Sequence, residues 1–226
     1  MTIQPSTGCA AEAAPLQGQH VNQGVLPRLY PILDPALLAD PAGVVVFARE
    51  LVNGGATLIQ YRNKTGTGRQ MLADARALRQ ALGSNIRLIM NDRADLCLAA
   101  GLDGVHVGQD DLSPESARLI VGDQLWVGVS THSVEQVTVA DRTSADYIAI
   151  GPVFATASKQ NPDPVVALEG VRAARAATRK PLVAIGGITR LNCAAVIEAG
   201  ADSVAVISDL VHDPAKSVAA FLRVLG

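Results

Sequence analysis

Short apolar runs alternate with Ala- and Leu-rich segments of helical spacing from residue 28 to the end of the chain. Several runs are apolar at every position, which is typical of strands covered on both faces in a parallel sheet. Strands that alternate with helices in this way indicate βαβ units. The predicted strands span 28–33, 57–62, 86–90, 104–107, 125–129, 146–151, 182–185 and 203–207. The predicted helices span about 41–53, 68–82, 92–100, 114–120, 133–140, 168–178, 190–199 and 213–224.

Eight strand–helix pairs in about 200 residues predict an α/β fold, a TIM (β/α)8 barrel, in one domain over residues 27–226. An open doubly wound sheet is the alternative, but it usually has fewer strands and a Gly-x-Gly-x-x-Gly turn after its first strand. Here the first strand is followed by Asp34-Pro35. Residues 1–26 are poor in charge and rich in Gln, Gly, Ala and Pro, so we expect a flexible leader that takes no part in the fold.

The composition narrows the classes of function. Of the 226 residues, 49% are hydrophobic and only 3% aromatic, so we expect a core packed from Ala, Val, Leu and Ile. So few aromatic residues disfavour a base-stacking platform for single-stranded nucleic acid. The net charge of −2 gives no global basic field for a nucleic acid or an anionic membrane, and no apolar run approaches the length of a membrane span. Small anions bound by a local cluster of charges stay open as ligands.

The three cysteines indicate a reducing compartment. They are odd in number and none of them pair in a Cys-x-x-Cys motif. Cys97 and Cys193 lie among apolar residues on helical segments, so we interpret these two as small core residues. The N-terminus lacks a basic region followed by an apolar stretch, so no secretory signal is expected. We therefore predict a cytoplasmic protein.

The carboxyl end of the second predicted strand carries three polar side chains. In a TIM barrel the functional site lies at this end of the strands. Strand side chains alternate, so Gln60, Arg62 and Lys64 point the same way, above Leu58. Two cations at the barrel mouth would be costly without an anionic partner, which favours an anionic ligand there. The alternative is a solvated polar end of the strand.

Carboxylates follow the next two predicted strands. Asn91-Asp92 ends the third, and Gln109-Asp110-Asp111 follows the fourth. Neighbouring carboxylates need a cation or a shared proton, and Mg²⁺ bound by one or two carboxylates together with substrate phosphates fits this need. The alternative is that Asp92 caps the following helix, since Asp is favoured at that position.

Hydroxyl groups and glycines follow the remaining strands. Ser130 could donate a hydrogen bond to a phosphate, whereas His106 lies inside the fourth strand and is predicted to be packed or to support other residues. The loop after the sixth strand, 151–159, is rich in hydroxyl groups and ends in Lys159, which suits phosphate or diphosphate, although a plain surface loop could look similar.

Loops after strands seven and eight are the usual phosphate site of a TIM barrel. Gly186-Gly187 opens a helix and exposes backbone N–H groups there, and Ile207-Ser208 ends the last strand. A tight turn alone could also explain the two glycines. The strand ends therefore predict two separate anion sites, and two such sites suggest two phosphorylated substrates.

Several of these segments, in this order, resemble the thiamine phosphate synthase family over about residues 28–212. The resembling segments are LIQYRNKT, IMNDRADLCLAAGLDGVHVGQDDL, VGVSTHS, DYIAIGPVFATASK, VAIGGIT and ADSVAVIS. The resemblance implies a TIM-barrel transferase that joins hydroxymethylpyrimidine diphosphate to thiazole phosphate and releases diphosphate, with Mg²⁺ and small-molecule substrates as its only expected partners. It also implies a largely dissociative reaction that needs no protein nucleophile.

The resemblance assigns roles residue by residue. Arg62, Lys64 and Lys159 would be catalytic, by stabilising the departing diphosphate. The pyrimidine diphosphate would be held by these three together with Gln60, Asn91 and Ser130, and Mg²⁺ by Asp92 and Asp111. The thiazole phosphate would be held by Thr156, Ser158, Gly187, Ile207 and Ser208.

The chain departs from the family pattern at a few positions. Tyr61 and Asn63 replace the usual Leu and Glu, and Tyr61 should face the helices. Ala155 replaces a common Pro, and Ser158 replaces a common Thr but keeps the hydroxyl group. The alternatives are a thiazole tautomerase-like isomerase of the same fold, a non-catalytic thiamine-phosphate binding protein, and another phosphate-binding barrel enzyme. The complete set of charged residues favours the synthase.

Overall fold

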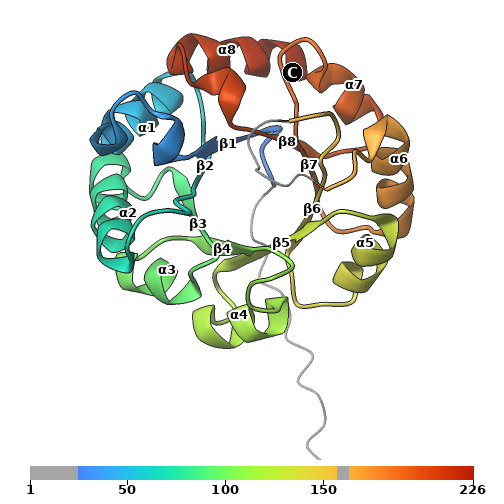
Figure 1. Cartoon of the computed structure of the whole chain (residues 1–226), viewed down its shortest axis with the longest axis horizontal. Helices are drawn as coiled ribbons and strands as arrows, with labels where there is room; N and C mark the ends of the chain where they lie inside the picture. The colour runs from blue at the N-terminus through green and yellow to red at the C-terminus, as the bar shows by residue number, and fades with distance from the viewer. Residues whose placement is uncertain (1–24, 157–162) are drawn as a thin grey trace, which may run out of the picture.

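A computed structural model describes residues 25–156 and 163–226, which form a closed ring of eight parallel strands inside a ring of helices (Figure 1). The strands are β1 (Leu29–Leu33), β2 (Leu58–Tyr61), β3 (Arg87–Asn91), β4 (Gly104–Val107), β5 (Trp126–Thr131), β6 (Tyr147–Ile150), β7 (Leu182–Ile185) and β8 (Ser203–Val206). The α-helices are α1 (Val44–Asn53), α2 (Gly68–Leu82), α3 (Ala94–Ala100), α4 (Pro114–Val121), α5 (Val134–Asp141), α6 (Ala167–Ala177), α7 (Cys193–Glu198) and α8 (Pro214–Leu225).

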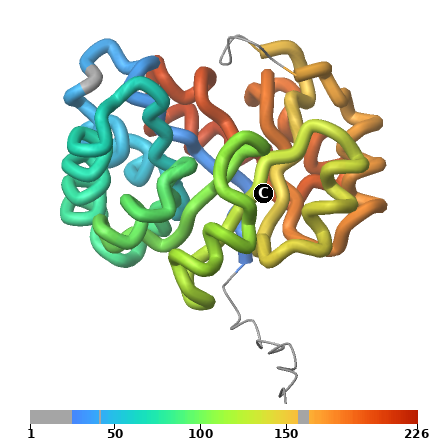
Figure 2. The backbone as a smooth tube through the Cα atoms, turned by 60° about the horizontal axis from the view of Figure 1, so that its bottom comes forward, coloured from blue at the N-terminus to red at the C-terminus, as the bar shows by residue number. Residues whose placement is uncertain are grey.

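The strand order confirms the predicted TIM barrel. β1 pairs in parallel with β2 on one side and with β8 on the other, in the registers Ile32↔Gln60 and Leu29↔Val204. The first and last helices, α1 and α8, therefore pack against each other, and the tube view shows these blue and red segments side by side (Figure 2). Closure excludes the open doubly wound alternative, whose edge strands would stay unpaired.

Three short 3-10 helices were not predicted: η1 (Pro35–Leu37), η2 (Pro41–Gly43) and η3 (Ser208–Leu210). The predicted helix over 41–53 begins as η2, and its α-helical part starts only at Val44. An Asp-Pro pair explains this start, because Asp40 accepts a hydrogen bond from the backbone N–H of Ala42 at 3.0 Å and proline fits a first helical position.

Two layers of apolar side chains lie on the two faces of the strand ring. The outer layer, between strands and helices, includes Leu29, Leu33 and Tyr61, together with both Cys97 and Cys193. This confirms the two cysteines as core residues and the outward direction of Tyr61. The alternation of β-strand side chains sends the next residue along each strand into the barrel.

The inner layer holds three of the seven aromatic residues. Its members are Leu26, Tyr30, Ile32, Leu58, Ile89, Trp126, Tyr147, Ala149, Val183 and Ala205. Aliphatic residues dominate the outer layer as expected, but two tyrosines and the single tryptophan fill the interior. Leu26 lay in the predicted leader, yet its side chain is buried in this layer; residues 1–24 lie outside the described part.

Three arginines clamp the amino ends of the strands in the same way. Each arginine lies in the last turn of a helix, α2, α4 or α6, and pairs with the aspartate that directly precedes β4, β6 or β8, respectively. Each aspartate also accepts a hydrogen bond from a backbone N–H of the neighbouring strand, β3, β5 or β7. The three sets are Arg79, Asp103 and Leu88; Arg118, Asp146 and Val127; and Arg175, Asp202 and Leu182.

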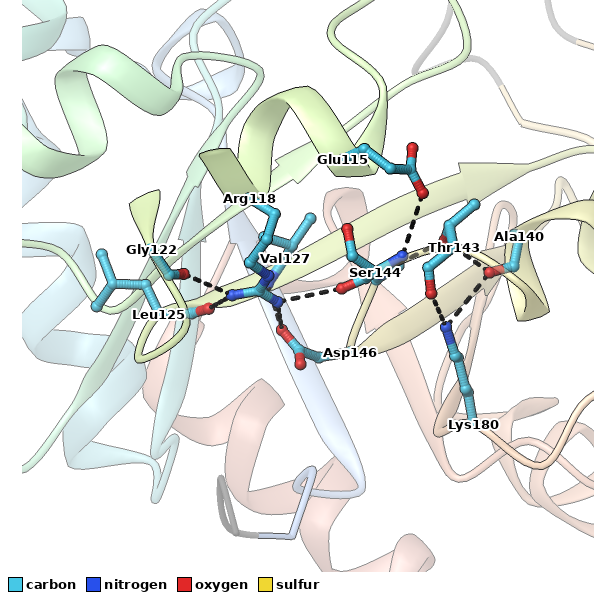
Figure 3. Close-up of polar contacts among 11 residues, drawn as sticks. Glu115, Arg118, Gly122, Leu125, Val127, Ala140, Thr143, Ser144, Asp146 and Lys180 are labelled. Carbon is cyan, nitrogen blue, oxygen red and sulfur yellow. Dashed lines mark hydrogen bonds and ion pairs between the residues drawn. The ribbon is translucent and has the colours of Figure 1, made fainter. Parts of the chain in front are cut away.

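Figure 3 shows the most buried of these clamps. Arg118 donates to the carbonyl groups of Gly122 and Leu125 at 2.8 and 2.5 Å, to Ser144 at 3.2 Å and to the Asp146 carboxylate at 2.5 Å. The guanidinium thus ties α4 to the start of β5 and the start of β6. This end of a TIM barrel is the one associated with stability, while chemistry lies at the opposite end. Within the described residues, no helix is long and apolar enough to cross a membrane.

Candidate functional site

A cavity of about 460 Å³ opens at the carboxyl ends of the strands. All of the predicted site residues that the structure describes line it. They are Gln60, Arg62, Lys64, Asn91, Asp92, Asp111, Ser130, Thr156, Gly187, Ile207 and Ser208. The remaining two predicted residues, Ser158 and Lys159, lie outside the described residues. The strand-end positions chosen from the sequence therefore converge on one hollow.

Arg62 is held by a carboxylate from the neighbouring strand end. Asp34 directly follows β1, and it forms an ion pair with the guanidinium of Arg62. Its other oxygen accepts a hydrogen bond from the backbone N–H of Ala36 at 3.0 Å, which caps η1. Asp34 is 6% exposed and Arg62 is 22% exposed by side chain, so the pair lies in the wall while part of the guanidinium still faces the cavity.

Lys64 forms an ion pair with Asp92, at the end of β3. Burial raises the pKa of the Asp92 carboxyl group; Lys64 lowers it, and a hydrogen bond with the Asp111 carboxyl group raises it again. Two carboxyl groups from consecutive strand ends therefore meet beside one ammonium group. Such a cluster has a surplus of negative charge that a further cation would neutralise.

The backbone at Asp92 is unusual. Its φ is +61°, in the left-handed region that few residues other than glycine, asparagine and aspartate adopt. The backbone N–H of Asp92 donates to the carbonyl of His106 at 2.7 Å. The first capping position of α3 is Arg93, which makes no side-chain cap. Asp92 thus does not cap α3; its carboxylate turns to Lys64 and the cavity instead.

The donor set at this point suits a magnesium ion that is shared with a substrate. Among residues 25–156 and 163–226, no cluster of three or more His, Cys, Asp or Glu side chains could hold a metal ion. Asp92 and Asp111 supply two carboxylates, and Mg²⁺ is commonly bound by one or two carboxylates with water and substrate phosphate oxygens completing the octahedron. The residues present therefore fit Mg²⁺ brought together with a phosphorylated ligand.

The opposite wall is a glycine turn after β7. Gly187 has a φ of +64°, and a Cβ atom there would lie 2.5 Å from the carbonyl oxygen of Ala155. The carbonyl of Gly187 accepts a hydrogen bond from the Asn192 side chain at 3.1 Å, and Asn192 also accepts from the Thr189 backbone at 2.8 Å. The turn is thereby fixed with its backbone against the cavity, in the region where TIM barrels bind phosphate.

The floor of the cavity is a chain of hydrogen bonds across the barrel interior. Gln60 donates to the Tyr30 hydroxyl at 3.0 Å, and the Tyr30 and Tyr147 hydroxyls lie 2.9 Å apart. The Nδ1 atom of His106 lies 3.0 Å from the Tyr147 hydroxyl, and its Nε2 atom lies 2.8 Å from the Ser130 hydroxyl. Burial lowers the pKa of His106 to about 4, so the ring is neutral at neutral pH.

Sequence reasoning missed several residues that line or support the cavity. In the sequence, Asp34 only argues against a glycine-rich turn, and no local motif marks Tyr30 as functional. The period-two alternation in β1 could have indicated both, because residues 30, 32 and 34 share the inward face. Gln109, which donates to the carbonyl of Ser130 at 2.6 Å, and His132, whose Nδ1 lies 2.7 Å from the carbonyl oxygen of Gly151, also line the cavity. His106 is buried and hydrogen-bonded, as predicted.

Comparison with known proteins finds close relatives. The family model described as thiamine monophosphate synthase matches residues 29–210. A thiamine-phosphate synthase of Koribacter versatilis is 58% identical over 203 residues, which cover 88% of this chain and 96% of the relative. One from Chloroflexus aurantiacus is 42% identical over 200 residues, covering 88% and 92%.

A solved structure is also similar. The thiamine phosphate pyrophosphorylase from Pyrococcus furiosus superimposes with a TM-score of 0.78 and 34% sequence identity, over 88% of this chain and 95% of that one. The family match spans all eight strands, from β1 to η3, including each strand end that lines the cavity. The chain belongs to the thiamine monophosphate synthase family.

Proposed function

We propose that the chain is a transferase that joins 4-amino-2-methyl-5-hydroxymethylpyrimidine diphosphate to 4-methyl-5-(2-phosphoethyl)thiazole, giving thiamine phosphate and diphosphate. One observation carries this proposal: a single cavity holds a cluster of cations and carboxylates on one wall and a backbone turn suited to phosphate on the other. The names of the relatives, which are thiamine-phosphate synthases, point to the same reaction.

The pyrimidine diphosphate belongs on the wall formed by β2, β3 and β4. Arg62 and Lys64 supply positive charge for the diphosphate, and Asp92 with Asp111 would hold Mg²⁺ against it. Lys64 now pairs with Asp92, so the arrival of a diphosphate and a metal ion would give each of these groups a new partner of opposite charge. Lys159 is proposed to add a further cation and Asn91 a polar contact, both from the family resemblance.

The thiazole phosphate belongs on the opposite wall. Gly187 brings backbone close to the cavity where a larger residue would collide with Ala155. Ile207 and Ser208 lie at the end of β8, where η3 begins. Thr156 contributes a hydroxyl group, and Ser158 is proposed to do the same. The two substrates would thereby meet over the floor of the barrel.

Catalysis would consist mainly of charge stabilisation and positioning. The bond between the pyrimidine methylene and the diphosphate oxygen breaks, the electron pair leaves with diphosphate, and the thiazole nitrogen forms the new bond to the methylene carbon. Arg62 and Lys64 stabilise the negative charge that develops on the leaving diphosphate. When bound, Mg²⁺ would add Lewis-acid stabilisation of that charge. No protein nucleophile is required.

Three finer assignments belong to the same proposal. The cofactor is Mg²⁺, supported by the paired carboxylates. The location is the cytoplasm, supported by the cysteine usage and by the phosphorylated substrates. Residues 27–226 form the catalytic domain and residues 1–26 a leader, as supported by the start of β1 at Leu29. Leu26 departs from this division, because its side chain packs into the inner layer.

The test is an assay with single omissions. The full-length protein is incubated with both substrates and Mg²⁺, and thiamine phosphate and diphosphate are quantified, with each component left out in turn. We expect equal amounts of the two products, and none when either substrate or Mg²⁺ is missing. Metal-independent isomerisation of a thiazole phosphate would support the tautomerase alternative, and binding without turnover would support the binding-protein alternative. Either result would overturn the proposal.

A further inference from the structure

The hydrogen-bonded floor of the cavity contains two buried tyrosine hydroxyls to which the proposed reaction assigns no role. Tyr30 and Tyr147 are 1% and 2% exposed, and their hydroxyls meet in the middle of the barrel although the residues are 117 positions apart. Gly128 makes room for this contact, because a Cβ atom there would lie 2.1 Å from the Tyr147 ring. The Tyr147 ring also stacks on His106, with 5.5 Å between centroids. The geometry fixes both tyrosines in place.

Counting hydrogens gives the chain a direction. The Gln60 amide nitrogen can only donate, so the Tyr30 oxygen accepts from it. Among the described residues the other hydrogen-bond partner of the Tyr30 hydroxyl is the Tyr147 oxygen, so a satisfied Tyr30 hydrogen is donated to Tyr147. Tyr147 then gives its own hydrogen to Nδ1 of His106. A neutral imidazole that accepts at Nδ1 carries its hydrogen on Nε2, which donates to Ser130. The direction of each hydrogen bond therefore determines the direction of the next one in the chain.

The direction decides what each end offers to a ligand. Ser130 receives a hydrogen bond from His106, so its own hydroxyl hydrogen is directed elsewhere, and Ser130 lines the cavity. At the other end, Gln60 uses its amino group on Tyr30, which leaves its carbonyl oxygen as the acceptor it presents. The cavity floor therefore offers one donor, at Ser130, and one acceptor, at Gln60.

We propose that Tyr30, Tyr147 and His106 are positioning residues that select a 4-aminopyrimidine over a 4-oxopyrimidine by fixing Ser130 as a donor and Gln60 as an acceptor. This inference rests on the proposed function. An aminopyrimidine has an acceptor ring nitrogen beside a donor amino group, which complements that pair. An oxopyrimidine has a donor ring N–H beside an acceptor carbonyl, which is the reverse pattern. To bind it equally well, the whole chain would have to reverse, including the Gln60 amide and the His106 tautomer.

The first test reads the tautomer of His106 directly. The ¹⁵N-labelled full-length protein, without ligand at pH 7.5, is examined by long-range ¹H–¹⁵N correlation spectroscopy, and the signals are assigned with His106→Gln. We expect hydrogen on Nε2 and none on Nδ1. Hydrogen on Nδ1 would mean the reverse direction, and a mixture of both tautomers would mean no fixed direction. Either result overturns the inference.

The second test measures discrimination between ligands. Tyr147→Phe removes one hydroxyl from the middle of the chain, and Tyr61→Phe is the matched control. Tyr61 also has a buried ring and a hydrogen-bonded hydroxyl, but it donates to Asp74 at 2.6 Å, outside the barrel. Dissociation constants for the 4-amino pyrimidine diphosphate and its 4-oxo analogue are measured by calorimetry.

We expect the wild type and Tyr61→Phe to prefer the amino compound by the same factor, and Tyr147→Phe to lose about tenfold of that preference. A merely structural role for Tyr147 would weaken both ligands equally and leave the ratio unchanged, and that result would overturn the inference. Its failure can be told apart from failure of the proposed function. If the protein forms thiamine phosphate but His106 carries its hydrogen on Nδ1, only the inference is overturned. If His106 carries its hydrogen on Nε2 but no thiamine phosphate forms, only the proposed reaction is overturned.

Discussion

Asp34 and Arg62 form an ion pair across the neighbouring ends of β1 and β2, and Asp34 caps η1 with its second oxygen. One carboxylate therefore performs two tasks: it starts the segment that leaves the barrel, and it fixes the guanidinium that faces the cavity. A side chain as long as arginine loses considerable rotamer freedom when it is held in this way. The ion pair thus prepares Arg62 for an anion before the anion arrives.

Asp34→Asn is expected to lower kcat/KM for the pyrimidine diphosphate by about 100-fold, because a misplaced Arg62 would no longer meet the diphosphate. The asparagine oxygen can still cap η1, so the melting temperature should change little. Steady-state kinetics and thermal unfolding check both parts.

Asp40→Asn is the matched control for Asp34→Asn. Asp40 caps η2 through an identical contact, a 3.0 Å hydrogen bond from the N–H two residues later. The capped N–H group is exposed, so this variant should keep wild-type kinetics. If both variants lost activity equally, the effect would belong to the loop and not to Arg62.

Asp92→Asn is expected to reduce turnover by about 100-fold or more and to raise the Mg²⁺ concentration needed for half-maximal rate. Asparagine also tolerates the left-handed backbone that Asp92 adopts, so the variant should fold. Asp95→Asn is the control, since Asp95 lies one turn along the chain, exposed and paired with Arg93. The initial rates of both variants are measured against Mg²⁺ concentration. If Asp92→Asn needed the same Mg²⁺ concentration for half-maximal rate as the wild type, Asp92 would not be a metal ligand.

Gly187→Ala is expected to raise the KM for the thiazole phosphate at least about tenfold, which corresponds to about 1.4 kcal/mol of lost binding. The added methyl group would press on the Ala155 carbonyl and displace the turn. Gly101→Ala separates strain from collision, because Gly101 has nearly the same φ, +66°, with no atom within 4 Å of an added Cβ. That variant should lose about 1 kcal/mol of stability and no affinity. Equal KM values for the thiazole phosphate in both variants would place the phosphate elsewhere.

Arg118→Met is expected to destabilise the fold by about 3 kcal/mol, because it removes the guanidinium that pairs with the largely buried Asp146 carboxylate. Arg172→Met, which removes an exposed pair with Glu169, should cost less than about 0.5 kcal/mol. Urea unfolding measures both, and kcat near wild type in Arg118→Met would confirm that the clamp serves stability at the end of the barrel away from the cavity. A decrease of less than about 1 kcal/mol in the free energy of unfolding of Arg118→Met would show that the clamp contributes little to stability.

Features that depend on the alternation of side chains along a strand could be predicted from the sequence. Gln60, Arg62 and Lys64 could be assigned to one side of the chain because strand residues alternate, and the structure places all three in the cavity wall. The strands themselves were recognised because apolar runs mark them. The start of α1 was misplaced, since Asp40-Pro41 forms a separate short turn before it.

Side-chain contacts across the barrel could not be predicted from the sequence. Whether Tyr30 meets Tyr147 depends on the stagger of β1 against β6, which no local pattern records. The ion-pair partners of Lys64 and Arg62 could not be predicted either, because several carboxylates follow neighbouring strands. Only the closed barrel shows that Lys64 pairs with Asp92 and Arg62 with Asp34. The low aromatic content also did not reveal that Tyr30, Tyr147 and Trp126 would meet in the barrel interior, while the other four aromatic residues lie in or against the outer layer.

The most direct test of the account is the position of the metal and the products in a crystal of the full-length protein. Crystals grown with thiamine phosphate, diphosphate and Mn²⁺ in place of Mg²⁺ would be measured at a wavelength where manganese scatters anomalously. We expect one anomalous peak between Asp92 and Asp111, with diphosphate against Arg62 and Lys64 and the thiazole phosphate at Gly187. A peak away from both carboxylates, or products bound outside this cavity, would contradict it.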